Sequence, residues 1–270
     1  MTDPAADSPA ARLRSRVLSE DRAVFGGWLS VSSPHFLDAL SASSLDYVGI
    51  DCQHGLVSEA DAARLIAGSP PTTAARLVRV PANRPEAIGR VLDGGADGVI
   101  VPTVNSSREA RAAVTAARFP PDGERSYGPM ARFLPRDPDE LGRRALVLPM
   151  IETSAGLNSV VEILAVPGVD GVYVGPADLG ISLGLGPGQF PARPELEPAL
   201  RTVVEAGRAT GKIVGIHAGS EHFAERYVGL GFRLLTLGVE TSFVTSGVER
   251  ALERAGAVAG SPGAEHAAPY

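Results

Sequence analysis

The chain has 270 residues, of which 44% are hydrophobic and 21% are charged, a composition typical of a globular protein with a full hydrophobic core. Its formal net charge of -6, without a basic cluster interleaved with aromatic residues, argues against nucleic acid as the main partner. No apolar run approaches the roughly 18 residues of a membrane span and no signal peptide is evident, so we expect a cytoplasmic protein without a membrane partner.

Two residue counts restrict the chemistry. The chain holds one lysine, Lys212, which opens the run KIVGIHA and so stands at the entrance of a predicted strand. In a β/α barrel this end lies away from the chemistry, so we expect no Schiff-base lysine. The single cysteine, Cys52, excludes an intrachain disulfide and a Cys-rich zinc site, and we interpret it as a small buried residue.

Short runs rich in β-branched residues alternate with alanine-rich amphipathic stretches along the chain. The runs are residues 23–30, 45–51, 75–80, 97–102, 145–151, 170–175, 212–218 and 233–238. Because they are apolar on both faces, they indicate parallel strands covered by helices. This alternation predicts an α/β protein, a (β/α)8 TIM barrel in a single domain over residues 17–256, rather than a doubly wound sheet.

Helix starts and loops complete this prediction. Helix signals stand at four places along the chain, namely Ser33 before Pro34, Ser58 with Asp61, Asn83 before Pro85, and Ser106 with Glu109, the last as a capping box. Residues 119–140 and 181–198 form long loops, which we expect on the active face. By composition, residues 1–16 and 257–270 are expected to be disordered.

Polar residues stand at or just after the ends of several predicted strands. They are Asp51, His54, Arg79, Glu152, Asp178 and His217. The carboxyl ends of parallel strands open into one mouth, where Glu152 and Asp178 would repel each other unless a cation lay between them. Acidic ligands without cysteine favour Mg²⁺ or Mn²⁺, although Co²⁺ or Zn²⁺ could substitute; each carboxylate alone could equally cap a helix or turn.

A histidine and an arginine add a base and a cation to this predicted mouth. Asp51 and His54 flank the tight loop DCQHG, and a carboxylate beside an imidazole raises its basicity, which suits proton transfer. Alternation in the strand places Arg79 on the opposite face from its neighbours, either inside the barrel or against a helix. Asp93 ends a predicted helix, where its charge opposes the helix dipole, so we expect it to have a partner, such as His54 of the same or a neighbouring subunit.

The segment Gly175-Pro176-Ala177-Asp178 predicts a tight turn. Its amides at Ala177 and Asp178 could bind a substrate carboxylate beside the metal. Neither this turn nor GLGPG at 184–188 lies between a strand and a helix at the spacing that a nucleotide-binding loop requires, so we expect no nucleotide cofactor.

These motifs together resemble the HpcH/HpaI aldolase family of class II pyruvate aldolases over about residues 12–255. FGGWLS, IDCQHG, VRVP, LDGGADGVIVP, PPDGERSYG, PMIET and VDGVYVGPADL follow one another in the family's order. The resemblance implies metal ligands at Glu152 and Asp178, and a catalytic His54 with Asp51 and Asp93 as acidic partners. It also implies that Arg79 binds the keto oxygen of a pyruvate unit.

The resemblance further implies a barrel whose last helix, here ETSFVTSGVERALERAG, is exchanged between subunits of a homo-oligomer, commonly a trimer of dimers or homohexamer. The chain departs from the family pattern at Cys52, Gln53 and Pro129. It departs also at Met150, where glutamine is common. Together with His217 in the segment HAGS, Met150 is assigned to the substrate pocket and is expected to bear on which aldehyde fits.

The function expected from these residues is reversible, metal-dependent cleavage of a 4-hydroxy-2-oxo acid into pyruvate and an aldehyde. Three alternatives remain at this stage: a CoA-ester lyase of the citrate lyase β or malyl-CoA type, an oxaloacetate decarboxylase, and a non-catalytic oligomeric binding protein. The CoA-ester alternative requires a basic surface, for which the sequence offers Arg132, Arg136, Arg143 and Arg144.

Overall fold

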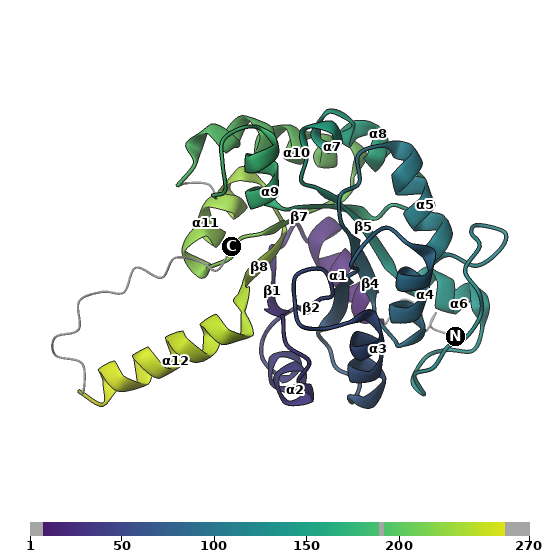
Figure 1. Cartoon of the computed structure of the whole chain (residues 1–270), viewed down its shortest axis with the longest axis horizontal. Helices are drawn as coiled ribbons and strands as arrows, with labels where there is room; N and C mark the ends of the chain where they lie inside the picture. The colour runs from purple at the N-terminus through teal and green to yellow at the C-terminus, as the bar shows by residue number, and fades with distance from the viewer. Residues whose placement is uncertain (1–7, 189–191, 257–270) are drawn as a thin grey trace.

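Eight parallel strands close into a barrel in the order in which they occur along the chain (Figure 1). The computed structural model describes residues 8–188 and 192–256. The strands are β1 (Val24–Leu29), β2 (Tyr47–Asp51), β3 (Ala75–Arg79), β4 (Gly98–Val101), β5 (Leu146–Ile151), β6 (Gly171–Val174), β7 (Ile213–His217) and β8 (Leu234–Val239). The predicted TIM barrel is confirmed, and each of the eight predicted runs forms a strand.

Helices cover the outside of the barrel between successive strands. They are α2 (Pro34–Ala42), α3 (Glu59–Gly68), α4 (Pro85–Asp93), α5 (Ser107–Ala117), α6 (Pro138–Arg144), α7 (Ser154–Asn158), α8 (Val160–Leu164), α9 (Pro176–Ser182), α10 (Glu197–Thr210) with a preceding 3₁₀ turn (Pro194–Leu196), and α11 (Glu221–Leu230). A further helix, α12 (Glu240–Arg254), follows the last strand. The predicted starts at Ser33, Ser58 and Ser106 are confirmed, because each serine side chain accepts a backbone amide of its helix.

Two details of the predicted helix starts are wrong. Arg84, not Asn83, precedes α4, and the Asn83 side chain instead donates to the carbonyl of Glu109. The Glu109 carboxylate accepts the amide of Asn105 rather than that of Ser106, so only half of the predicted capping box forms.

The interior of the barrel is filled by side chains from all eight strands. Trp28, Tyr47 and Tyr173 are almost fully buried there. The hydroxyl of Thr236 lies between the two tyrosines, 2.8 Å from the Tyr47 hydroxyl and 2.6 Å from that of Tyr173. These hydrogen bonds satisfy the buried polar groups, so the barrel centre is a packed core rather than a channel.

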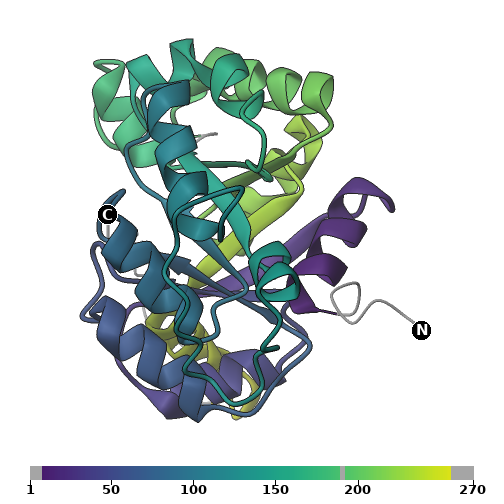
Figure 2. The same cartoon turned by 90° about the vertical axis from the view of Figure 1, so that its right-hand side faces the viewer.

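The strand-entrance end of the barrel is covered by a further helix, α1 (Pro9–Leu18), drawn in purple in Figures 1 and 2. The expectation of disorder is therefore wrong for residues 9–16, while residues 1–7 and 257–270 lie outside the described residues. The helix starts at Ser8, whose side chain accepts the amide of Ala11. Its apolar side, Leu13 with two smaller neighbours, is buried in the same cluster as the barrel interior. Burial of that side stabilises a segment whose overall composition is polar.

Buried and half-buried aspartates at the strand entrances connect this helix to the strands. Asp46, Asp97 and Asp170 stand just before β2, β4 and β6, and each accepts the backbone amide of a residue at the start of the preceding strand. Arg14 pairs with Asp170 at 2.6 Å, and Arg16 pairs with Asp46. The ion pairs orient α1 across the entrances of the strands.

The loop after α5 lies at this same end of the barrel, not on the active face as predicted. Arg125 of the loop pairs with Asp93 at the C-terminal end of α4, at 2.6 Å. The reason is topological, because a segment that leads from a helix into the next strand must end at the strand entrances. The end of α9 lies at the opposite end of the barrel, because Ser182 accepts the amide of Ser154, which follows β5.

The last helix, α12, extends away from the barrel (Figure 1). Only Glu240, at its start, is buried, and it accepts the amide and the hydroxyl of Ser30 at 2.9 and 2.6 Å. Val244, Val248 and Leu252 are 40–50% exposed. Exchange of this helix between subunits stays a prediction. Across the described part of the chain, none of the helices has both the length and the hydrophobicity that crossing a bilayer would require.

Candidate active site

The ends of five strands place most of the predicted site residues at one mouth of the barrel. Asp51, Arg79 and His217 are the last residues of β2, β3 and β7. Glu152 directly follows β5, and Gly175 directly follows β6. The strand-exit rule therefore brings together side chains that are far apart in the sequence.

Asp51 and Arg79 form a buried, two-pronged ion pair. They are neighbours in the register of β2 and β3. Arg79 donates from Nε to Oδ1 at 2.9 Å and from Nη2 to Oδ2 at 2.6 Å. Burial alone would raise the pKa of Asp51, but the hydrogen bonds and the charge of Arg79 hold it below its ordinary value. Arg79 thus points into the barrel mouth and is held in one orientation by a charged partner.

Aromatic side chains form the wall beside Arg79. Its guanidinium lies 5.4 Å from the centre of the Trp28 ring, and the His217 ring meets Trp28 edge-on at 5.3 Å. The Trp28 ring fits because Gly49 has no side chain, since a Cβ there would lie 2.2 Å from the indole. Burial, with the positive charge of Arg79, lowers the pKa of His217 to about 4. His217 is therefore a neutral hydrogen-bonding group at neutral pH.

Glu152 is a buried carboxylate with one unpartnered oxygen. It is 4% exposed, and Thr103 donates to Oε1 from its amide at 2.6 Å and from its hydroxyl at 3.0 Å. Oε2 is buried and has no hydrogen-bond partner among the described residues. Burial, aided by the negative charge of Asp178, raises the pKa of Glu152. Such an oxygen is costly unless a cation or a proton occupies it.

The backbone after β6 approaches the Glu152 carboxylate closely because residue 175 is a glycine. A Cβ at Gly175 would lie 2.9 Å from Oε2 of Glu152 and 3.0 Å from the end of the Met150 side chain. Thr103 adopts a φ of 54°, a strained conformation for a residue that is not glycine. In this conformation the amide and the hydroxyl of Thr103 both donate to Oε1 of Glu152, and Oε2 is left without a partner among the described residues.

Asp178 lies in the first turn of α9, which begins at Pro176 immediately after β6. The Asp178 side chain is exposed, and its charge is close enough to act on Glu152. The first amides of a helix have no partner within that helix, so Ala177 and Asp178 offer two donors beside the carboxylates. The turn predicted over residues 175–178 is thus the start of a helix.

His54 lies on the exposed loop that follows β2. Its backbone amide donates to Asp51 at 3.2 Å, and within the described residues the Asp51 carboxylate makes no hydrogen bond to the imidazole. Asp51 therefore fixes the loop and Arg79, rather than the His54 ring as expected from the sequence. In the same loop Cys52 is buried, which raises the pKa of its thiol to about 12.

Asp93 is not brought to the site within one chain. It lies at the C-terminal end of α4, at the strand-entrance end, where it pairs with Arg125. The partner expected from the helix dipole is thus an arginine of the same chain. Arg125 is itself buried, with a side chain 2% exposed, so the pair is part of the packing.

Two residues of the site were missed by sequence reasoning. Thr103 follows β4 and obeys the same strand-exit rule as the carboxylates, but a threonine is not ionisable and gave no signal. Trp28 lies within the first predicted strand, where nothing in the sequence indicates a specific partner. Its contacts with Arg79 and His217 depend on the close approach of β1 and β2 at Gly49.

The site combines groups that can bind a cation with groups that can bind an anion. The carboxylates of Glu152 and Asp178 suit a cation, and Oε2 of Glu152 lacks a hydrogen-bond partner in the part of the chain that the structure describes. The guanidinium of Arg79 and the amides at the start of α9 suit an anion. Among the described residues no three His, Cys, Asp or Glu side chains converge as a ready-made metal cage. Glu152 and Asp178 fit a hard divalent cation whose remaining ligands come from solvent or substrate.

Comparison with known proteins places these features in a family context. A family model described as HpcH/HpaI aldolase/citrate lyase matches residues 24–246. A 4-hydroxy-2-oxo-heptane-1,7-dioate aldolase from Klebsiella pneumoniae is 34% identical over 238 residues, covering 86% of this chain and 89% of the relative.

Solved structures agree with the sequence match. A family protein from Burkholderia cenocepacia J2315 superposes with a TM-score of 0.81 at 34% identity, over 90% of this chain and 98% of the other. An HpcH/HpaI aldolase from Desulfitobacterium hafniense DCB-2 gives 0.79 at 26% identity, over 92% and 98%. The similarity thus extends over the whole barrel.

Proposed function

The chain belongs to the HpcH/HpaI aldolase/citrate lyase family, and from this membership and the site geometry we propose that it is a metal-dependent carbon–carbon lyase. The proposed reaction is the reversible cleavage of a 4-hydroxy-2-oxo acid into pyruvate and an aldehyde. The relative from Klebsiella pneumoniae carries the name of such a substrate. The aldehyde part is the variable element of the proposal.

The observation that carries the proposal is the orphan oxygen of Glu152. Oε2 is buried and has no partner among the described residues, and it lies beside Gly175 and near the charge of Asp178. We propose that Glu152 and Asp178 hold a divalent ion, Mg²⁺ or Mn²⁺ in preference to Co²⁺ or Zn²⁺. When bound, such an ion would polarise the 2-keto group of the substrate as a Lewis acid.

Arg79 is proposed to receive the charge that develops during cleavage. As the bond between C3 and C4 breaks, its electron pair moves into the pyruvate enolate and the negative charge collects on the 2-oxygen. Because Asp51 already fixes the guanidinium from the other side, Arg79 needs no reorganisation to stabilise this oxygen. Loss of one such contact typically costs about two to three orders of magnitude in rate.

The helix start after β6 is proposed to bind the substrate carboxylate. The turn from Gly175 and Pro176 positions the amides of Ala177 and Asp178, and their dipoles favour a negative charge there. Met150 supplies an apolar wall, since it is 1% exposed and lies beside Gly175. His217 is proposed to face the aldehyde part from the other wall.

His54 is proposed as the base that takes the proton of the 4-hydroxyl group. As the C4–O bond becomes a carbonyl, this proton passes to the imidazole, and the enolate later takes a proton at C3 to give pyruvate. His54 is exposed at the mouth, where a substrate can reach it. Since Asp93 lies at the other end of its own barrel, its proposed acidic partnership with His54 requires a neighbouring subunit.

We accordingly propose a cytoplasmic homo-oligomer, a trimer of dimers in which α12 is exchanged between subunits. The support is the exposed apolar side of α12, formed by Val244, Val248 and Leu252. Such a surface on a helix that leaves the barrel is typical of an element that packs against another chain.

The reaction is tested by incubating the metal-supplemented protein with pyruvate and a panel of aldehydes, and analysing the products by mass. We expect adducts of pyruvate plus one aldehyde that appear only with the metal. The matched control is the Arg79→Ala protein under the same conditions. Adducts formed equally by the control, or after exhaustive chelation, would contradict the proposal.

A CoA-ester lyase is the nearest rival, since the family name includes citrate lyase. The arginines available for CoA phosphates do not favour it. Arg144 pairs with Asp97 at the strand-entrance end, and Arg136 donates to the carbonyl of Pro129 in the loop at that same end. Turnover of a thioester but not of the free acid would establish the rival.

Release of carbon dioxide from oxaloacetate would reveal the decarboxylase activity. Pyruvate binding without turnover would establish a non-catalytic binding protein.

A further inference from the structure

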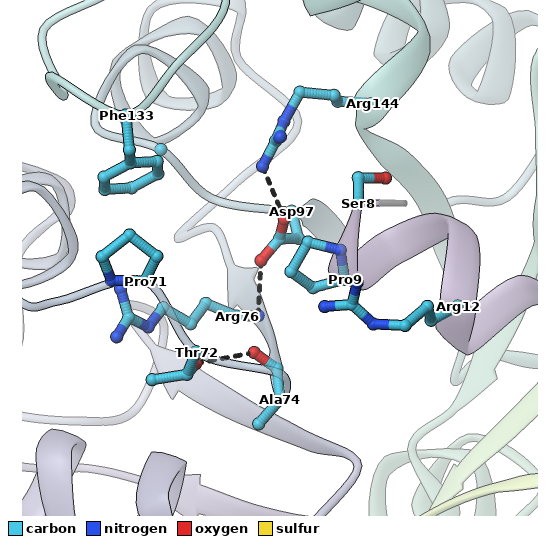
Figure 3. A pocket seen from close by; sticks show the side chains of 11 residues that line it. Ser8, Pro9, Arg12, Pro71, Thr72, Ala74, Arg76, Asp97, Phe133 and Arg144 are labelled. Atoms are coloured by element: carbon cyan, nitrogen blue, oxygen red, sulfur yellow. Dashed lines mark hydrogen bonds and ion pairs between the residues drawn. The ribbon is translucent and has the colours of Figure 1, made fainter. Parts of the chain in front are cut away.

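Glu152 and Asp97 are buried carboxylates at opposite ends of the barrel, and they differ in how the chain satisfies them. Each residue is 4% exposed. Asp97 lines a cavity of about 320 Å³ at the strand entrances, where its two oxygens accept from Arg144 Nη2 at 3.1 Å and from the amide of Arg76 at 3.0 Å (Figure 3). At Glu152, the amide and the hydroxyl of Thr103 both donate to Oε1. The position of Thr103 therefore decides which oxygen of Glu152 stays available.

The side chain of Asn105 holds Thr103 in its unusual conformation. Thr103 has a φ of 54°, in the left-handed region that residues other than glycine rarely adopt. Asn105 Nδ2 donates to the Thr103 carbonyl at 3.1 Å. The backbone amide of Asn105 donates in turn to the carboxylate of Glu109 at 2.7 Å, in the first turn of α5. Asn105 thus ties the strained residue to a helix.

The same side chain also binds the residue that follows Glu152. The Asn105 carbonyl oxygen accepts the hydroxyl of Thr153. This orientation of the side-chain amide is the required one, because the Thr103 carbonyl can only accept and so must face the Nδ2 group. The Thr153 hydroxyl itself accepts the amide of Gly156 at 3.0 Å and caps α7. Asn105 therefore bridges the loop after β4 and the start of α7, on either side of the Glu152 carboxylate.

The loop and α7 are in close contact at Gly156. A Cβ at this position would lie 2.8 Å from the carbonyl oxygen of Val104 and 3.3 Å from Thr153 Oγ1. Val104 stands between Thr103 and Asn105 and is 1% exposed. The absence of a side chain at Gly156 therefore lets the loop approach α7 closely enough for Asn105 to reach Thr153.

We propose that Asn105 is a positioning residue of the candidate metal site, which keeps Thr103 on one oxygen of Glu152 and so leaves the other oxygen free for the ion. Asn105 acts through its hydrogen bonds to Thr103 and Thr153 and is assigned no contact with ion or substrate. This role rests on the proposed function, because it requires an ion at Glu152. Loss of a hydrogen-bonding group that orients a metal ligand typically weakens metal binding about 10- to 100-fold.

Binding of Mn²⁺ to metal-free protein, measured from the electron paramagnetic resonance of the free ion, tests this role without reference to catalysis. We expect Asn105→Ala to bind Mn²⁺ at least about tenfold more weakly than the wild type. Asn83→Ala is the matched control, because its side chain likewise donates to one backbone carbonyl, that of Glu109, at 2.9 Å. The control should bind Mn²⁺ with the wild-type affinity.

Two variants of Thr153 guard against a general loosening of the loop in Asn105→Ala. Thr153→Ser keeps the hydroxyl that bonds to Asn105 and should retain the wild-type affinity for Mn²⁺. Thr153→Val removes that hydroxyl at nearly the same volume and should weaken binding about tenfold. Melting temperatures in chelator report the stability of each protein separately, so a loss of stability without a loss of affinity would show that Asn105 serves packing alone.

The outcomes separate this role from the function on which it rests. A wild type that does not bind Mn²⁺ would overturn the proposed function and the role of Asn105 with it. Wild-type affinity in Asn105→Ala, or equal affinities of the two Thr153 variants, would overturn the role of Asn105 and leave the metal site in place.

Discussion

Glu152 is stabilised poorly by its own chain. Thr103 satisfies one oxygen, while the other is buried and unpartnered, and burial raises the pKa of the carboxyl group. A folded pKa above the unfolded value means that Glu152 destabilises the folded chain as pH rises through the interval between the two values. A cation bound at Oε2 removes this cost. The residue is thus typical of a ligand site rather than of packing.

The variant Glu152→Gln distinguishes a metal-ligand role of Glu152 from a role in packing. In chelator at about pH 8, we expect its melting temperature to equal or exceed that of the wild type by about 2–4 °C, since the buried charge is gone. The advantage should shrink as pH falls, because the wild-type carboxyl group then takes up its proton. Added Mn²⁺ should raise the melting temperature of the wild type only. Scanning calorimetry measures both effects, and equal stabilisation of the two proteins by Mn²⁺ would contradict metal binding at Glu152.

The lowered pKa of His217 predicts that folding stability depends on pH in the direction opposite to that expected from Glu152. Its pKa of about 4 lies below the ordinary value because of burial and the charge of Arg79. In the unfolded chain the imidazole takes up a proton near its ordinary pKa, whereas in the folded chain it stays neutral until about pH 4. Stability should therefore fall as pH decreases through this interval.

The variant His217→Gln tests this dependence, because glutamine keeps a neutral polar group and cannot titrate. We expect the loss of unfolding free energy between about pH 6.5 and pH 4 to be smaller in the variant than in the wild type. Urea unfolding at several pH values measures it. His222→Gln is a control on α11, where an equal effect would show that the dependence does not arise at the site.

Sequence reasoning located the ionisable site residues because strand exits follow from a simple periodic pattern. It could not give the partners, since these depend on register and on single backbone angles. The pairing of Asp51 with Arg79 rather than with the His54 ring follows from the alignment of β2 and β3. The role of Thr103 depends on its unusual φ, which no pattern of neighbours indicates.

At the scale of elements, α1 shows where composition misleads. The segment is rich in alanine and arginine and was expected to be disordered, yet Leu13 is 2% exposed within the barrel cluster. The arginines that make it polar pair with Asp46 and Asp170, which lie far along the chain. Strand positions were predictable because each is a local apolar run, whereas the position of α1 is set by long-range contacts.

Leu13→Ala tests whether α1 is an integral part of the fold. Because Leu13 fills the end of the barrel, we expect the free energy of unfolding to fall by about 2–4 kcal/mol. Ser15→Ala, on the exposed side of the same helix, should have little effect. Denaturant titration of the two variants makes the comparison. A loss below about 0.5 kcal/mol for Leu13→Ala would show that the helix does not contribute to stability.

At the scale of the whole molecule, α12 is the helix whose apolar side the described residues of its own chain leave exposed. Val244, Val248 and Leu252 recur at intervals of four residues and so share one side of the helix. Val248→Asp is expected to shift the protein to smaller species in light scattering coupled to size exclusion. Arg250→Asp, on the other side of the helix, should leave the size unchanged. An unaltered size of Val248→Asp would contradict assembly through this surface.

The central claim is that Glu152 and Asp178 hold the ion that activates a bound 2-oxo acid. It is tested most directly by the exchange of the methyl protons of pyruvate in deuterated water, followed by proton NMR. We predict exchange by the wild type with Mg²⁺, its loss on chelation, its recovery with added metal, and at least about a hundredfold slower exchange by Glu152→Gln. Exchange at the wild-type rate in chelator, or in Glu152→Gln, would contradict the claim.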